Sequence, residues 1–164
     1  MSRLRKTLTV LLTVFAVFTL GYLAGREVER GRVAAAIDPD QALPQRPRQL
    51  VATYFHETKR CVKCNTIEAY ARDAVLEGYP ELVSNQRVVW RVLNMDAPEN
   101  RDLARRYELT GASVVLSDRV EGKEEDYAVL PRVWDLTDDK DGFLAYVRSE
   151  AEFYLEEDEL GSEE

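Results

Sequence analysis

The pattern of apolar and polar positions predicts a small α/β domain over residues 49–155. Runs rich in β-branched and aromatic residues, which suit a pleated sheet, predict four strands. These strands cover residues 50–55, 87–95, 112–116 and 127–130. The polar stretch 118–126 contains Gly122 and predicts the turn of a hairpin between the last two strands. Because helices link the first three strands, we expect those strands to be parallel.

Apolar residues that recur every three or four positions predict three helices. The first covers residues 65–77 and ends at Gly78 and Pro80. The second is expected to begin at Asp96 as its N-cap, and the third to begin within residues 138–141. The residues expected on their inner faces are, in chain order, Ile67, Tyr70, Ala71, Ala74 and Val75, then Leu103, Ala104 and Tyr107, then Phe143, Tyr146, Val147, Ala151 and Phe153.

An uncharged, apolar segment covers residues 7–25, after a cluster of three cations at Arg3, Arg5 and Lys6. As a helix it would be roughly 28 Å long, which matches the core of a bilayer. We therefore expect a transmembrane signal anchor over residues 1–26, with a cleaved signal peptide and a buried helix as the alternatives. The leading cations predict a cytoplasmic N-terminus and an extracytoplasmic, periplasmic domain. Residues 27–48 contain three prolines and are expected to be a linker.

Charge is distributed unevenly along the 164 residues, whose formal net charge is −8. Acidic residues dominate the C-terminus, and residues 156–164 are expected to form a solvated acidic tail. A nucleic-acid partner is not expected, because binding to a phosphate backbone requires a basic face. The acidic residues of the first helix, Glu68, Asp73 and Glu77, are expected on its solvated face, whereas Trp90 and Trp134 are expected in the core.

Both cysteines and the only histidine lie in the stretch YFHETKRCVKCNTIE, at the junction between the first strand and the first helix. A Cys-x-x-Cys pair at such a junction is typical of a dithiol redox site. The helix N-terminus and the cations Lys59, Arg60 and Lys63 favour the thiolate of Cys61. We therefore expect Cys61 to be the nucleophile and Cys64 the resolving cysteine of thiol–disulfide exchange.

Two other interpretations of the cysteine pair remain open. One is a structural disulfide, although a bond that closes so short a loop removes little chain entropy. The other is a metal or cluster site formed by Cys61, Cys64 and His56, with Glu57 or a second protomer completing the ligand set. The redox interpretation requires no cofactor beyond the Cys61–Cys64 disulfide. No glycine-rich phosphate loop is present for a flavin or nicotinamide cofactor.

The order of elements, together with the Cys-x-x-Cys at the first strand-to-helix turn, resembles the thioredoxin-like superfamily. The resemblance implies a three-layer α/β/α fold around a mixed sheet of about four strands, placed after the N-terminal transmembrane helix. The chain departs from thioredoxins in one respect: Ala112 or Ser113 occupies the position where they carry a cis-proline. In that family the proline holds peptide partners and keeps metals away from the dithiol. Its absence here therefore favours the interpretation of the cysteine pair as a metal site.

A closer resemblance is carried by YFHETKRCVKCNTIEAYA and RVVWRVLNMDAPENRDLARRYELT. These segments resemble a family of membrane-anchored, thioredoxin-like proteins that is known as the nitrophenyl compound nitroreductase subunit family. The leading hypothesis is thus a membrane-anchored dithiol protein that exchanges electrons with a protein thiol or disulfide partner, or with a membrane redox complex. The alternatives are a non-catalytic subunit that binds a metal or cluster through the cysteine pair, and an adaptor that keeps the fold for interaction only.

Overall fold

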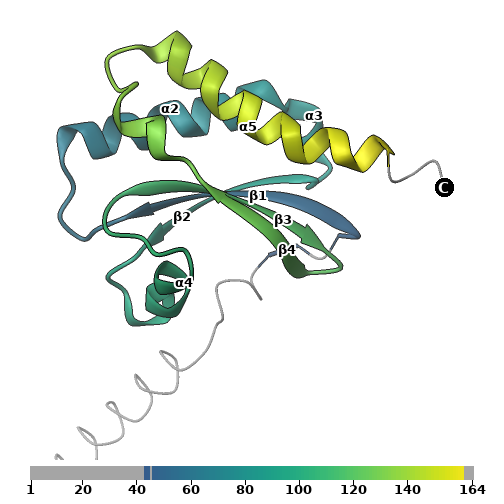
Figure 1. Ribbon diagram of the computed structural model, residues 1–164, viewed down its shortest axis with the longest axis horizontal. Coiled ribbons are helices and arrows are strands. Elements are labelled where there is room, and N and C mark those ends of the chain that lie inside the picture. Colours follow the sequence, from purple (N-terminus) through teal and green to yellow (C-terminus); the bar gives the residue numbers. More distant parts are fainter. Residues whose placement is uncertain (1–42, 45, 161–164) are drawn as a thin grey trace, which may run out of the picture. The chain divides into compact units, whose positions relative to one another are not determined.

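A four-stranded mixed sheet forms the centre of the domain (Figure 1). The computed structural model describes residues 43–44 and 46–160, with the backbone alone at 157–160. The strands stand in the order β2-β1-β3-β4, which makes β1 and β3 the central pair. Their bounds are Arg48–His56 for β1, Val88–Asn94 for β2, Ser113–Val120 for β3 and Lys123–Val129 for β4.

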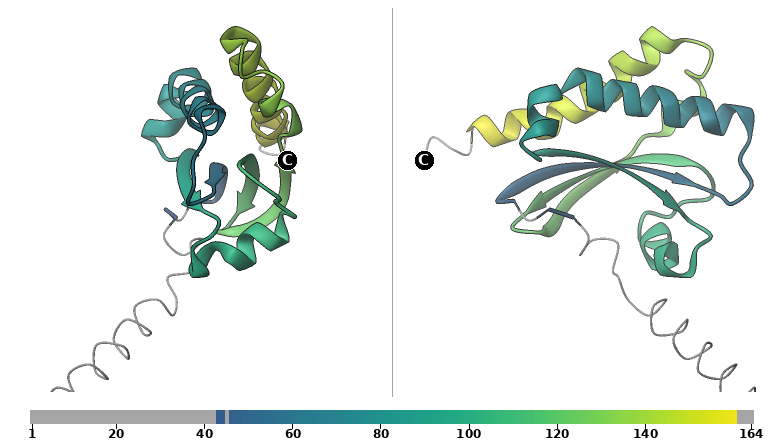
Figure 2. Two further views of the ribbon diagram at one scale, coloured as in Figure 1. Left: turned by 90° about the vertical axis from the view of Figure 1, so that its left-hand side faces the viewer. Right: turned by 180° about the vertical axis from the view of Figure 1, so that it is seen from behind.

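Helices cover both faces of this sheet, so the predicted three-layer arrangement is confirmed (Figure 2). The long helices α2 and α5 lie on one face together with the short α3, and α4 lies on the other face. The helices are α2 (Val62–Gly78), α3 (Pro80–Ser84), α4 (Arg101–Arg106) and α5 (Lys140–Leu160), with 3₁₀ turns η1 (Pro98–Asn100) and η2 (Pro131–Trp134).

The prediction that the first three strands are all parallel is wrong for the third. β1 and β2 are parallel, but β3 is antiparallel to β1. β2 ends with Asn94 beside His56, and β3 begins with Ser113 opposite Phe55. The last residue of β2 and the first residue of β3 therefore lie at the same end of the sheet. The connecting helix α4 has six residues, roughly 9 Å, whereas β2 has seven residues, roughly 23 Å as a strand. The connection is therefore too short to carry the chain to the opposite end of the sheet, and β3 starts where β2 ends and runs antiparallel to β1.

The predicted hairpin between the last two strands is confirmed, but its turn is shorter than the predicted stretch 118–126, because most of that stretch forms strands. β3 continues to Val120 and β4 begins at Lys123, which leaves Glu121 and Gly122 as a two-residue turn. Both turn residues have positive φ, 51° and 80°, as tight hairpins with a right-handed twist require. Several polar residues of this stretch are paired across the fold rather than solvated. Asp118, for example, is buried and bonds to Arg48, with 2.8 Å between Oδ2 and Nη2.

The main core lies between the sheet and the helices α2 and α5. Of the inner-face residues expected on the first helix, four are buried, and Tyr70 packs against the core from its edge. The second inner face is confirmed in full, and its Leu103 and Tyr107 pack with Phe55 and Val115 on the other side of the sheet. On α5 the predicted Phe153 is wrong, since it is 59% exposed, and Tyr154 is buried in its place. The spacing from Phe143 through Val147 and Ala151 to Tyr154 follows one helical face.

The two ends of the chain bear differently on the predicted domain limits. α5 continues to Leu160, so residues 156–160 of the expected tail are helical. The expected anchor at residues 1–26 and most of the linker at 27–48 lie outside the described residues. Within the part that the structure describes, no helix combines the length and apolar character needed to cross a membrane.

Candidate active site at the Cys61–Cys64 disulfide

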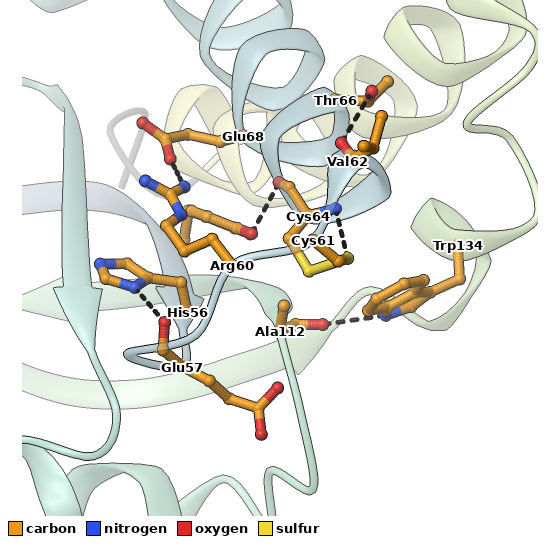
Figure 3. The surroundings of a disulfide bond; sticks show 11 residues. His56, Glu57, Arg60, Cys61, Val62, Cys64, Thr66, Glu68, Ala112 and Trp134 are labelled. Carbon is orange, nitrogen blue, oxygen red and sulfur yellow. Dashed lines mark hydrogen bonds and ion pairs between the residues drawn. A yellow bond between two sulfur atoms is a disulfide. The ribbon is translucent and has the colours of Figure 1, made fainter.

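Cys61 and Cys64 form a disulfide at the N-terminus of α2, with their Cα atoms 5.0 Å apart (Figure 3). Cys61 is the N-cap residue of the helix, and Cys64 lies in its first turn. Cys61 is exposed, whereas Cys64 is buried in the main core with 4% of its surface exposed. The predicted placement is confirmed: Cys61 is exposed at the start of the helix, and Cys64 is buried in its first turn.

The backbone at the disulfide explains why the helix begins here. Cys61 has an extended conformation, with φ −100° and ψ 169°, and its Sγ accepts a hydrogen bond of 3.0 Å from the backbone N–H of Cys64. The sulfur thus fills the capping role that a serine or aspartate oxygen more often has. The apolar repeat starts only at Ile67, so the sequence pattern placed the helix start three residues late, at Asn65 rather than Val62.

Hydrogen bonds hold the loop between β1 and Cys61 against the end of β2. The backbone N–H of Thr58 donates a hydrogen bond of 2.7 Å to Oδ2 of Asp96, and Asn94 Nδ2 donates one of 3.1 Å to the Thr58 hydroxyl. The bond from the Thr58 backbone lowers the pKa of Asp96 below its usual range. Asp96 was expected to cap the helix after β2. That prediction is wrong, because its carboxylate holds the loop instead and Ala97 precedes the 3₁₀ turn η1.

Tyr54 supports the disulfide from the sheet. Its side chain is buried beneath α2, and its hydroxyl donates a hydrogen bond of 2.7 Å to the backbone carbonyl of Cys64. Burial raises the pKa of Tyr54, an effect that the neighbouring Arg60 partly offsets. The hydroxyl therefore stays protonated at neutral pH and serves as a donor. Because β1 is one of the two central strands, this bond ties the first turn of the helix to the middle of the sheet.

One of the three cations expected to act on Cys61 is already paired. Arg60 forms an ion pair with Glu68 of α2, and its guanidinium Cζ lies 5.7 Å from the centre of the Tyr54 ring. Glu68 was expected on a freely solvated helix face, and this prediction is wrong because its side chain is only 26% exposed and is paired. Lys59 and Lys63 are exposed.

On the other side of the disulfide, Ala112, directly before β3, and Trp134 of η2 approach (Figure 3). The indole Nε1 of Trp134 donates a hydrogen bond of 2.9 Å to the carbonyl of Ala112. Ala112 is buried in the same cluster as Cys64. Trp134 was expected in the core but is 37% exposed, and Val62 next to Cys61 is 83% exposed. The surroundings of the disulfide thus include two apolar residues with exposed surface.

His56 lies at the end of β1, apart from the cysteine pair (Figure 3). Its Nδ1 is 2.8 Å from the carbonyl oxygen of Glu57, and its ring stacks near Tyr54 with 6.2 Å between the ring centres. No three His, Cys, Asp or Glu side chains gather as a metal site among the side chains that the structure describes, at residues 43–44 and 46–156. The structure therefore does not bring His56 to Cys61 and Cys64, and a metal at these residues stays a prediction.

Comparison with known proteins gives similarity to solved thioredoxin structures. A thioredoxin from Thermus thermophilus is 22% identical over 63% of this chain and 74% of its own, with a TM-score of 0.39. Thioredoxin O2 from Arabidopsis thaliana, in its oxidised state, is 14% identical over 71% of this chain and 88% of its own, with a TM-score of 0.35. No model of a protein family and no curated protein matches the sequence.

The fold is thioredoxin-like, as the sequence predicted. The strand order β2-β1-β3-β4, the helices on both faces and the disulfide at the first strand-to-helix turn carry this assignment. The sequence indicated the two cysteines, but not the four side chains that position them: Tyr54, Asp96, Glu68 and Trp134. Their partners lie between 8 and 38 residues away along the chain, too far for a local motif to reveal them.

Proposed function

We propose that this protein exchanges electrons with a protein partner by thiol–disulfide exchange at Cys61 and Cys64. The observation that carries the proposal is the pairing of an exposed Cys61 at the start of α2 with a buried Cys64 one turn later. A purely structural disulfide at this position would stabilise the fold little, because it closes a loop across a separation of only three residues. Exposure of one cysteine, in contrast, is what attack by or on a partner requires.

The exchange conserves atoms and electrons in two displacements. In the reduced protein, the Cys61 thiolate attacks one sulfur of a partner disulfide. The new bond is a mixed disulfide, the partner's disulfide bond breaks, and the departing thiolate takes up a proton. Cys64 then loses its proton and attacks Sγ of Cys61. This step closes the Cys61–Cys64 disulfide and releases the second partner thiol, so the partner gains two electrons. The same steps in reverse oxidise a dithiol.

Backbone geometry supports Cys61 as the attacking sulfur. The N–H of Cys64 already points at Sγ of Cys61 in the disulfide state. Once the bond is reduced, the same N–H can donate to a thiolate, and hydrogen bonds to an ionised acceptor are stronger than neutral ones. The positive end of the α2 dipole adds to this stabilisation. Cys64 stays within reach because Tyr54 holds its carbonyl.

The location of the domain is part of the proposal. The uncharged segment 7–25, after three cations, supports an anchor that leaves the domain on the extracytoplasmic side. An anchored dithiol would meet a membrane redox complex or an exported protein as its partner. The resemblance of the Cys-x-x-Cys region to the nitrophenyl compound nitroreductase subunit family agrees with a role as a subunit beside another redox protein.

The proposal can be tested on the full chain in detergent. We expect the protein to reach a reversible equilibrium with glutathione and to accelerate the reduction of insulin by dithiothreitol. The Cys61→Ser variant should be inactive. Cys64→Ser should instead accumulate a mixed disulfide through Cys61, visible by mass spectrometry and released by reductant. A wild-type disulfide that shows no defined equilibrium with glutathione, or a trapped adduct on Cys64 rather than Cys61, would contradict the proposal.

A further inference from the structure

The cation that directly precedes Cys61 is held by a carboxylate on the helix that carries the disulfide. Arg60 and Glu68 form an ion pair whose side chains are only 31% and 26% exposed. Glu68 follows Cys64 by four residues, one helical turn, so it lies on the same side of α2. Figure 3 shows the two side chains pointing toward each other, on the opposite side of the disulfide from Trp134.

We infer that Glu68 is a positioning residue that tunes the exchange reaction of Cys61 by holding Arg60 in this ion pair. The inference rests on the proposed function. Paired with Glu68 and placed over the Tyr54 ring, the guanidinium is compensated by a negative charge and fixed in position. Its effect at the Cys61 sulfur is then that of a neutral pair, not that of a full positive charge.

Release of Arg60 from Glu68 would shift the redox equilibrium of the Cys61–Cys64 disulfide in a defined direction. An unpaired guanidinium next to Cys61 in the chain would stabilise the thiolate, which exists only in the reduced protein. Stabilisation of the reduced form makes a dithiol couple more oxidising. Glu68 therefore keeps the couple more reducing than its local cations alone would make it. Lys59 and Lys63 are exposed, and solvent screens their charge more than that of a partly buried pair.

The test compares Glu68→Gln with wild type in the full chain, by equilibration of the Cys61–Cys64 disulfide with glutathione. Glu68→Gln should raise the equilibrium constant for reduction of the disulfide by about threefold, a typical size for a partly exposed charge. The rate of Cys61 alkylation by iodoacetamide at one fixed pH should rise with it. Arg60→Gln should shift both quantities in the opposite direction, and it supplies a second measurement if Glu68→Gln does not fold.

Two comparisons separate the inference from simpler explanations. Glu77→Gln makes the same charge change at an exposed site on α2, away from the disulfide, and should leave the equilibrium unchanged. Glu68→Gln made in an Arg60→Gln background should have a smaller effect than in wild type, because no cation remains to be released. An equal effect in both backgrounds would mean that Glu68 acts by its own charge and would overturn the inference.

The remaining outcomes are also decisive. If wild type equilibrates with glutathione and Glu68→Gln behaves as Glu77→Gln does, the inference is wrong while the proposed function stands. If wild type shows no equilibrium with glutathione, the proposed function fails and the inference fails with it. An unchanged far-ultraviolet circular dichroism spectrum in each variant assures that the comparison is between folded proteins.

Discussion

The hydroxyl of Tyr54 and the carbonyl of Cys64 are 2.7 Å apart, and their hydrogen bond joins the central strand to the first turn of α2. Both groups are buried, so water cannot replace the bond if it is lost. The backbone that positions Cys64 is therefore fixed from the sheet side as well as from within the helix. This contact links the stability of the fold to the geometry of the disulfide.

Tyr54→Phe should destabilise the domain while leaving its packing intact. The ring stays in place, and the Cys64 carbonyl loses a buried donor, a change that costs about 1 to 3 kcal/mol. Urea unfolding of the oxidised protein measures the difference. Tyr70→Phe is the matched control, since no hydrogen bond of its hydroxyl is found among the described residues and its ring packs against Phe143 in the same core. Equal losses in the two variants would refute a specific role for the Tyr54 hydroxyl.

Trp134 should report the redox state of the disulfide by its fluorescence. Its indole is hydrogen-bonded to Ala112 beside the two sulfurs, and disulfides quench nearby indoles (Figure 3). Reduction should raise the emission of wild type and of Trp90→Phe to a similar extent, because Trp90 packs against the core from β2. In Trp134→Phe the redox-dependent change should vanish. A change that follows Trp90 instead would place the quenched indole elsewhere.

Local patterns predicted the elements that depend on neighbours in sequence. The apolar period of α2 and the β-branched runs of β1 and β2 predicted these elements to within a few residues. Each pattern places apolar side chains at regular intervals on the face that packs against the core. The Cys-x-x-Cys likewise has a fixed local geometry. Its position at the start of a helix could be stated from the order of a strand, two cysteines and an amphipathic segment.

Errors arose where long-range pairing overrides local polarity. The stretch from Asp118 to Asp126 looks like a loop, yet Asp118 bonds to Arg48, 70 residues away, and Glu124 to Ser117 and Tyr107. A charged residue whose partner lies on another strand can form a strand, and the partner is not visible in the local sequence. The direction of β3 was missed for a related reason, since it depends on the length of α4 and not on any residue within β3 itself.

The ion pair between Asp73 and Lys140 should give stability a defined pH dependence. It joins α2 to α5, with 2.9 Å between Oδ2 and Nζ. The bond from Lys140 lowers the pKa of Asp73 below its ordinary value of 3.8. The folded state thus binds this proton more weakly than the unfolded chain does, and the contribution is present above pH 3.8 and lost as pH falls through the folded value. The same bond raises the pKa of Lys140 above 10.5, so its share is lost as pH rises through that folded value.

Asp73→Asn tests this dependence. Its deficit in unfolding free energy against wild type should be constant near neutral pH and should shrink on acidification below about pH 4, where Asp residues become protonated. Asp102→Asn serves as a control, because Asp102 pairs with Arg105 on the surface, where both side chains are largely exposed. Its deficit should be close to zero at every pH. A deficit of Asp73→Asn that did not change on acidification would contradict the assigned role of the ion pair.

Glu124 joins the two strands of the hairpin to the end of α4. Its carboxylate accepts hydrogen bonds from the hydroxyls of Tyr107 and Ser117 and pairs with Arg106, and its side chain is only 11% exposed. Tyr107 also packs on Phe55, one residue before the end of the strand that leads into the site. The carboxylate therefore anchors the connection between β2 and β3, which ends at Ala112 beside the disulfide.

Glu124→Gln should lower the unfolding free energy by roughly 1.5 to 3 kcal/mol, the range for hydrogen bonds to a charged group. The amide keeps the shape of the side chain but removes the charge that two hydroxyls and a guanidinium share. Glu125→Gln, at an exposed position on the same strand, should change stability by less than about 0.5 kcal/mol, as surface substitutions usually do. Urea unfolding monitored by circular dichroism measures both. Because Glu124 has no contact with the cysteines, its variant should keep the wild-type equilibrium with glutathione while folded. A stable Glu124→Gln protein would show that the hydroxyls and Arg106 find equal partners without the charge.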